Sequence, residues 1–240
     1  MATLVQMAVL NESDQITDIE IEPMVAAVQE FVSGTVGPPW DVAVKLTQIP
    51  KGQPAPSGSW QMVFLNDTDQ ANALGYHQRT WGGLYLGKVF VRTSLSLGQS
   101  VSRVLSHEVM EALVDPNMNR TAPGPVPYAI EVGDPLSRDS QGRMVLGQLM
   151  SGIALPAYYY PNYGTRYDLD GHLTGPIPTV AKEGGTYLMW FDGWRWQSHM
   201  YAIDPDDLIA MQAHYGSRRH RRMIGGDKLR NSTAGAPRTS

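Results

Sequence analysis

Hydrophobic and polar positions alternate in three short segments near the start of the chain, and this period of two predicts β-strands. The segments are 3–10, 40–49 and 60–65. Between the first two, apolar residues recur at spacings of three and four over 19–32, which predicts an α-helix. The chain therefore opens as strand, helix, strand and strand, with a Pro- and Gly-rich loop before the third strand.

A fourth strand is expected over 84–91, and the segment after it carries the clearest helical pattern of the chain. Over 98–114, apolar residues cover about half of the helical circumference. Pro116 disfavours helical backbone in the residue before it, so the helix should end near Asp115. Such a wide apolar surface predicts a largely buried helix whose polar face lines a cleft.

Beyond residue 116 the composition shifts to Pro, Gly, Tyr and Trp, and only short strand-like runs remain. Strands are expected at 144–150 and over 186–196, where Asp192-Gly193 is typical of a hairpin turn. The run Tyr158–Tyr160 is expected to fill the core. A last helix is expected over 205–215.

These patterns predict an α+β protein in three parts. The parts are an α/β half over 1–135, a half rich in strands and loops with a C-terminal helix over 136–216, and a basic tail over 217–240. With 42% apolar and 18% charged residues, the chain of 240 residues can bury a full core. The N-terminal apolar stretch has no basic residue before it, so no signal peptide is predicted.

The charge of the chain is unevenly distributed. The tail over 217–240 holds seven basic residues against one acidic residue and carries +6, which leaves −10 on residues 1–216. Such a tail suits an acidic surface on a protein or a nucleic acid, or else remains a solvated segment. Because the body is acidic and the tail has no aromatic residue for base stacking, nucleic acid is expected only through the tail.

Four ionisable side chains share one face of the predicted helix. They are His107, Glu108, Glu111 and Asp115, within an arc of about 100° at about 100° per residue. Carboxylates at spacings of three and four repel by about 0.2–0.5 kcal/mol per pair, and the helix dipole disfavours anions at the C-terminal end. A bound cation would remove both penalties. The alternative is that the acids are solvated or paired with Arg103 or Arg120.

The string His107-Glu108-Val109-Met110-Glu111 is close to the His-Glu-x-x-His signature. In that signature two residues four apart bind zinc, and the Glu polarises the attacking water. Glu111 replaces the second histidine here, and zinc also accepts carboxylate oxygen. The chain has no cysteine, so a third ligand must be His, Asp or Glu, and Glu131 and Asp134 downstream are the expected sources.

The longer pattern His-Glu-x-x-Glu-Ala-x-x-Asp-Pro, followed by Glu-x-x-Asp, resembles the motif of zincin-like metallopeptidase-type proteins. Among these are the plant phosphate-induced, exordium-like proteins and related bacterial and phage-encoded proteins. The resemblance covers Leu105 to Pro135. It implies a zincin-like mixed sheet with a substrate-binding edge strand before the active-site helix, an order that Gly75-Tyr76-His77 and the strand to Val91 fit. It also implies Glu108 as the catalytic residue, with metal ligands drawn from His107, Glu111, Asp115, Glu131 and Asp134.

The identity of the metal stays open at the level of the sequence. Zinc is the first expectation from the motif. A carboxylate in place of the second histidine enriches the site in hard oxygen donors, which also suit calcium. A site without metal is the third alternative.

Two functions from different classes fit this pattern. In the first, the protein is a zinc metallopeptidase, in which Glu108 takes the proton of a metal-activated water that attacks a peptide carbonyl. In the second, it is a catalytically silent virion assembly protein of a phage, built on a zincin-like scaffold, whose tail contacts neighbouring subunits. The expected partners are proteins or peptides and not membranes. The expected location is the cytoplasm, or the virion if a phage encodes the protein.

Overall fold

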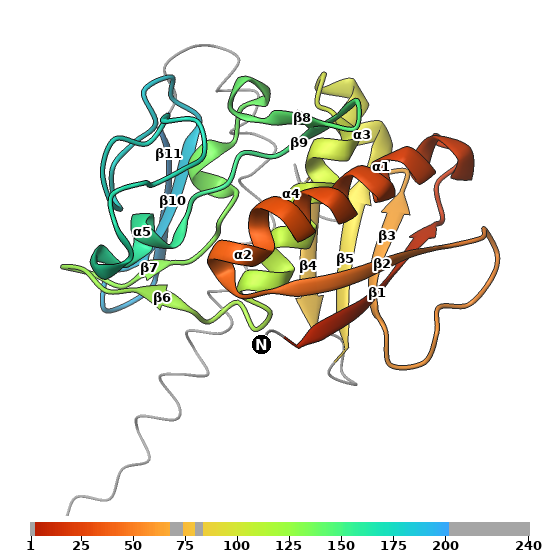
Figure 1. The fold of residues 1–240 in the computed structure, drawn as a ribbon, viewed down its shortest axis with the longest axis horizontal. Helices are drawn as coiled ribbons and strands as arrows, with labels where there is room; N and C mark the ends of the chain where they lie inside the picture. Colours follow the sequence, from red (N-terminus) through yellow and green to blue (C-terminus); the bar gives the residue numbers. More distant parts are fainter. Residues whose placement is uncertain (1–2, 68–73, 80–83, 202–240) are drawn as a thin grey trace, which may run out of the picture.

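The computed structural model describes residues 3–67, 74–79 and 84–201 (Figure 1). Helices and strands occur in both halves of this part of the chain, and the predicted α+β class is confirmed. The helix predicted over 205–215 and the basic tail over 217–240 lie outside the described residues. Among the described helices, none combines the length and the apolar character that crossing a bilayer requires.

A five-stranded mixed sheet forms the first half of the fold (Figure 1). In spatial order its strands are β2 (Ala43–Ile49), β1 (Leu4–Asn11), β3 (Trp60–Leu65), β5 (Tyr85–Phe90) and β4 (Gly75–Arg79). β1 is parallel to β2 and β3, and β3 is parallel to β5. The edge strand β4 runs antiparallel to β5. The four segments predicted as strands thus form the parallel part of the sheet.

Helix α1 (Asp18–Phe31) packs on this sheet and continues without a break into two shorter elements. A capping box starts it: Thr17 Oγ1 accepts from the Glu20 N–H, and the Glu20 carboxylate accepts from the Thr17 N–H at 2.8 Å. A π-helical turn (Val32–Val36) and α2 (Gly37–Trp40) follow. The first residues of the segment predicted as a strand over 40–49 are therefore helical or a turn.

Helix α4 (Val101–Val114) packs against β4 and β5 on one side and against α1 and β9 on the others. All 14 of its residues are buried, and it ends before Asp115 as Pro116 predicts. The polar face of α4 is buried as well as its apolar face, and the expected cleft beside it stays a prediction. A short helix, α3 (Val91–Ser96), precedes it and was not predicted.

The second half consists of short strands and loops, as predicted (Figure 1). One sheet has the order β11 (Trp196–Tyr201), β10 (Thr186–Phe191), β7 (Tyr128–Ala129) and β6 (Thr121–Ala122). The predicted strand at 144–150 is a hairpin of β8 (Arg143–Val145) and β9 (Gln148–Met150). A helical turn, α5 (Pro156–Tyr159), follows. The turn after Phe191 joins β10 to β11, as the Asp192-Gly193 pair predicts.

One hydrophobic core joins the two halves. It contains Val9 and Val28 from the first half together with Ile153 and Tyr158 from the second. The indole N–H of Trp40 also donates to the Ala154 carbonyl at 3.2 Å, across the same boundary. The parts predicted as 1–135 and 136–216 therefore share a core over the described residues.

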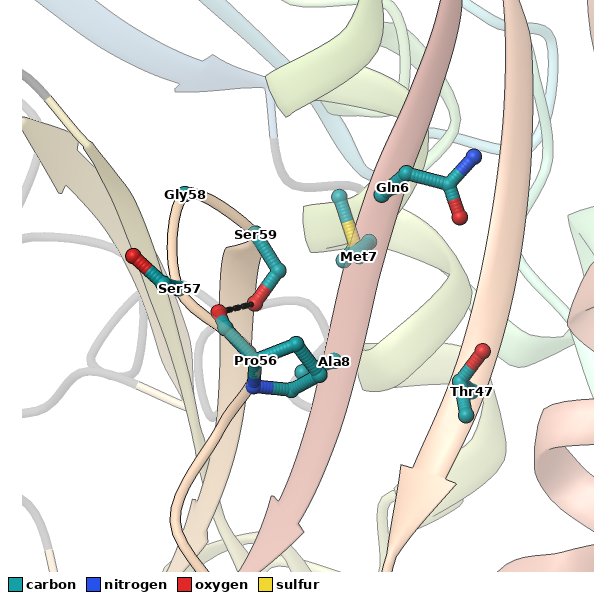
Figure 2. Close-up of a pocket in the computed structure, with 8 residues that line it drawn as sticks. All are labelled: Gln6, Met7, Ala8, Thr47, Pro56, Ser57, Gly58 and Ser59. Atoms are coloured by element: carbon teal, nitrogen blue, oxygen red, sulfur yellow. Dashed lines mark hydrogen bonds between the residues drawn. The ribbon is translucent and has the colours of Figure 1, made fainter.

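A cavity of about 240 Å³ opens beside β1 and β2, on the sheet face opposite the helices (Figure 2). It is lined by Gln6, Met7, Ala8, Thr47, Pro56, Ser57, Gly58 and Ser59. None of these carries a charge or an imidazole. The buried cluster of ionisable residues His107, Glu111 and Asp134 lies instead on the helix-covered side, at α4.

The core face of α4 provides a test of this packing. Leu105 is fully buried, so Leu105→Ala should lower the free energy of unfolding by about 2–5 kcal/mol, measured by chemical denaturation. The matched variant Leu95→Ala, on the exposed surface of α3, should change it by about 0.5 kcal/mol or less. Equal effects of the two substitutions would contradict the central place of α4.

Candidate metal centre

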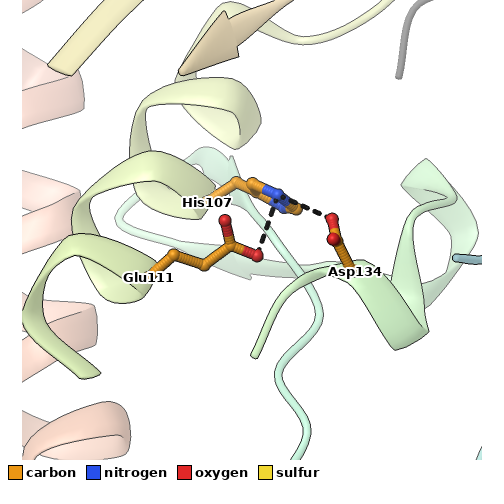
Figure 3. Close-up of side chains that lie close together, drawn as sticks. All are labelled: His107, Glu111 and Asp134. Carbon is orange, nitrogen blue, oxygen red and sulfur yellow. Dashed lines mark ion pairs between the residues drawn. The ribbon is translucent and has the colours of Figure 1, made fainter. Parts of the chain in front are cut away.

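Three ionisable side chains meet beside α4 (Figure 3). His107 and Glu111 come from successive turns of the helix, and Asp134 comes from the 3-10 turn Asp134–Leu136. One ligand atom from each lies within 4.8 Å of the others. His107 Nε2 is 3.2 Å from Glu111 Oε1 and 3.4 Å from Asp134 Oδ1. The structure thus brings together three of the five predicted ligands.

The local fold explains this convergence. Residues four apart on a helix lie on one face, so His107 and Glu111 are neighbours. The backbone N–H of Gly133 donates to Glu111 Oε1 at 3.2 Å, which fixes the loop that carries Asp134. Gly133 lies so close to the His107 ring that a Cβ there would overlap it and would lie 2.7 Å from Met110 Cε. The absence of a side chain at Gly133 therefore allows the loop to approach the helix.

All three side chains of this cluster are buried, and this burial makes any charge on them costly. His107, Glu111 and Asp134 are at most 3% exposed. Two carboxylates in such a place carry two negative charges away from water, which is costly unless positive charge compensates them. One imidazole nitrogen and two carboxylate oxygens are a donor set that divalent cations accept. The residues present therefore fit a bound metal ion.

Glu108, the predicted catalytic residue, is also buried, at 2% exposed. It lies against the edge strand, since a Cβ on Gly75 of β4 would come within 2.8 Å of Glu108 Cγ and 3.0 Å of Glu108 Oε1. It is not one of the three clustered ligands. Its place is between the cluster on α4 and the edge of the sheet.

Glu131 and Asp115 lie outside the group of three. Glu131 is buried, at 4% exposed, and its backbone carbonyl accepts from the Tyr159 hydroxyl at 2.7 Å. The two Asp115 oxygens accept from the backbone N–H groups of Asn119 and Arg120 at 3.1 and 3.0 Å. Asp115 therefore closes the loop after α4. The ligand roles of Glu131 and Asp115 stay predictions.

The sequence also allowed compensation of the acids by solvent or by arginines such as Arg103 and Arg120. The clustered acids are buried, so bulk solvent does not surround them. Arg103 is buried and pairs with Asp139, with Nε 2.6 Å from Oδ1. Burial lowers the pKa of Arg103, and the Asp139 carboxylate opposes that shift. Arg120 donates to the Val114 carbonyl at 2.7 Å and lies over the Trp40 ring. In these contacts the guanidinium groups of Arg103 and Arg120 bind groups other than the carboxylates of Glu111 and Asp134, which are buried.

Tyr159 adjoins the site, although the sequence predicted only that it fills the core. Burial raises its pKa well above the usual value, and Tyr158 and then the carboxylates of Asp134, Glu111 and Glu131 raise it further. The phenol therefore stays protonated and donates to the Glu131 carbonyl, which holds the loop leading to Asp134. The position of Tyr159 in a run of three tyrosines gave a signal for burial but none for this contact.

Comparison of the chain with protein-family models, with curated protein sequences and with solved structures gives no match. The site is therefore interpreted from its own chemistry.

The close approach of Gly133 to His107 can be tested by substitution. The φ of Gly133 is −90°, which any residue adopts, so Gly133→Ala should act through overlap alone and lower the free energy of unfolding by about 1–3 kcal/mol. Gly34→Ala is the matched control, because its Cβ would make only an ordinary contact at 3.8 Å. Thermal denaturation of both variants measures the difference. A Gly133→Ala protein as stable as the control would contradict the close approach.

Proposed function

We propose that this protein is a metal-dependent hydrolase whose metal ion is held by His107, Glu111 and Asp134. The observation that carries the proposal is the meeting of one imidazole nitrogen and two carboxylate oxygens within 4.8 Å in a buried place. The expected substrate is a peptide bond, as the resemblance to zincin-like proteins implies.

Two of the three spacings between the ligand atoms suit a tetrahedral ion, and all three lie within 4.8 Å. Ligands about 2.1 Å from a tetrahedral zinc are separated from one another by about 3.4 Å. The distances from His107 Nε2 to Glu111 and Asp134 are 3.2 and 3.4 Å. Three ligands from the protein with a fourth position for water are also the pattern of catalytic zinc sites.

The same donor set gives weaker support for calcium. Calcium takes six to eight oxygen ligands at about 2.3–2.6 Å. Within the described residues, the cluster offers two carboxylates and an imidazole nitrogen, which calcium does not prefer. Zinc or another first-row divalent ion is therefore the proposed cofactor.

Glu108 is the proposed general base. A bound divalent cation would supply Lewis acidity and make a water molecule acidic near neutral pH. Glu108 follows the first ligand on α4 and packs against Gly75 of β4, so it can serve a substrate held along that edge. It would take the proton of the attacking water and pass it to the leaving amine. The zincin resemblance implies a substrate-binding edge strand before the active-site helix, and the place of β4 at the edge of the sheet supports this assignment.

A second candidate is a scaffold that keeps this cluster without catalysis, as in an assembly protein that contacts neighbouring subunits. The burial of the cluster favours it, because His107, Glu108, Glu111 and Asp134 are all at most 3% exposed. A peptide substrate needs access to these groups. The two candidates differ on hydrolysis, and a cluster without metal would favour the scaffold.

The variant Glu108→Gln distinguishes the hydrolase from the scaffold. The variant should retain the metal content of the wild type and lose cleavage of an unstructured protein such as casein by about 10²–10⁴-fold, because the general base is gone. Glu22→Gln, on the exposed side of α1, is the matched control and should cleave normally. Metal content by mass spectrometry and peptide release are the measurements. Cleavage at the wild-type rate would refute the role of Glu108, and no cleavage by the wild type would favour the scaffold.

Removal of the metal should destabilise the fold, because the ion ties α4 to the loop of Asp134. At a free metal concentration about 100 times the Kd, binding stabilises the protein by about 2.7 kcal/mol. A chelator should therefore lower the melting temperature of the wild type. It should not change that of Glu111→Gln, which lacks one ligand. A wild-type melting curve that neither chelator nor added zinc shifts would contradict metal binding.

A further inference from the structure

We propose that Ser151 is a positioning residue that selects the tautomer of His107 in which Nδ1 carries the proton and Nε2 presents its lone pair to a cation. The inference rests on the metal binding proposed above. It assigns a role to a residue that lies far from the motif in the sequence and directly follows β9.

The direction of the hydrogen bonds around Ser151 carries the inference. Ser151 Oγ lies 3.2 Å from His107 Nδ1, and the Ser151 hydroxyl donates to the Gly152 carbonyl at 3.1 Å. A serine hydroxyl has one hydrogen and two lone pairs. When that hydrogen points to Gly152, Ser151 accepts from the imidazole, and His107 then carries its proton on Nδ1.

A proton on Nδ1 determines the state of the other ring nitrogen of His107, Nε2. A neutral imidazole with a proton on Nδ1 has its lone pair on Nε2, the atom that faces Glu111 and Asp134. The opposite tautomer would place an N–H on Nε2, and this N–H could donate to either carboxylate. That arrangement competes with metal binding. By accepting a hydrogen bond from Nδ1, Ser151 disfavours the tautomer that is protonated on Nε2.

Ser151 is itself held in place by the helix that carries His107. Its backbone N–H donates to Ser106 Oγ at 2.9 Å, and the Ser106 hydroxyl donates to the Arg103 carbonyl at 2.8 Å. Ser106 and Ser151 are both fully buried. The serine next to His107 in the chain thus fixes the serine that contacts its ring. Outer contacts of this kind orient metal-binding histidines, and their loss costs about 10–100-fold in affinity.

The test combines a tautomer measurement on the metal-free protein with a metal titration. At a pH where the imidazole is neutral, ¹⁵N-edited NMR of wild-type His107 should show the proton on Nδ1. In Ser151→Ala, the Nε2-protonated form should appear, and zinc affinity measured against a chromophoric chelator should fall by about 10–100-fold. Ser94→Ala is the matched control. It removes an equally buried hydroxyl that donates to the Phe90 carbonyl, and both readouts should stay as in the wild type.

Ser151→Cys provides a second variant of nearly the same shape, in case the alanine variant does not fold. Because sulfur is a weak acceptor, the tautomer and the affinity should shift in the same direction as in Ser151→Ala. The proposal is overturned if the wild type carries its proton on Nε2, or if both variants keep the Nδ1 proton and the wild-type affinity. If no form of the protein binds zinc, the proposed function fails, while the tautomer measurement still decides the role of Ser151.

Discussion

The structure depends on how it compensates negative charge buried along one face of α4. Glu108 and Glu111 lie on a helix that is enclosed from end to end, and Asp134 is brought against the same face by the loop that crosses it. His107 lies among these carboxylates, with Nε2 3.2 Å from Glu111 and 3.4 Å from Asp134. Arg103 and Arg120, the basic residues nearest in sequence, are directed to Asp139 and to Val114. This distribution of charge is what leads us to a cation at His107, Glu111 and Asp134.

The surrounding fold can be understood as support for that arrangement. The mixed sheet, α1 and β9 pack against α4, and the loop of Asp134 approaches its polar side. Gly133 and Gly75 allow backbone to approach His107 and Glu108 more closely than any side chain would permit. Ser151 and Tyr159 then fix the ring of His107 and the loop at Glu131. Positions distant in the chain therefore share one task, the orientation of a few side chains on one helix.

Much of this framework could be predicted from the sequence, because it follows from local periodicity. Alternation located β1 and β3, and the apolar pattern with Pro116 located α4 and its end. The spacing of four placed His107 and Glu111 together. Asp115 shows the limit of this reasoning, because an acid at the end of a helix can serve either a metal or the backbone N–H groups of the next loop, and the residue type does not distinguish the two.

The remaining features arise only from tertiary contacts. Nothing in the residues around Ser151 or Tyr159 indicates that they reach α4, since those contacts span long stretches of chain. The burial of the polar face could not be predicted for the same reason: a helical wheel shows which residues share a face but not what covers it. The π-helical turn after α1 also has no periodic signal in five residues.

The central claim is that a cation belongs between His107 Nε2 and the carboxylates of Glu111 and Asp134. Crystals grown with zinc, measured on both sides of the zinc absorption edge, test it most directly. The account predicts one anomalous peak at that point, in contact with all three side chains. A map with no peak there, with His107 instead donating a hydrogen bond to either carboxylate, would contradict it.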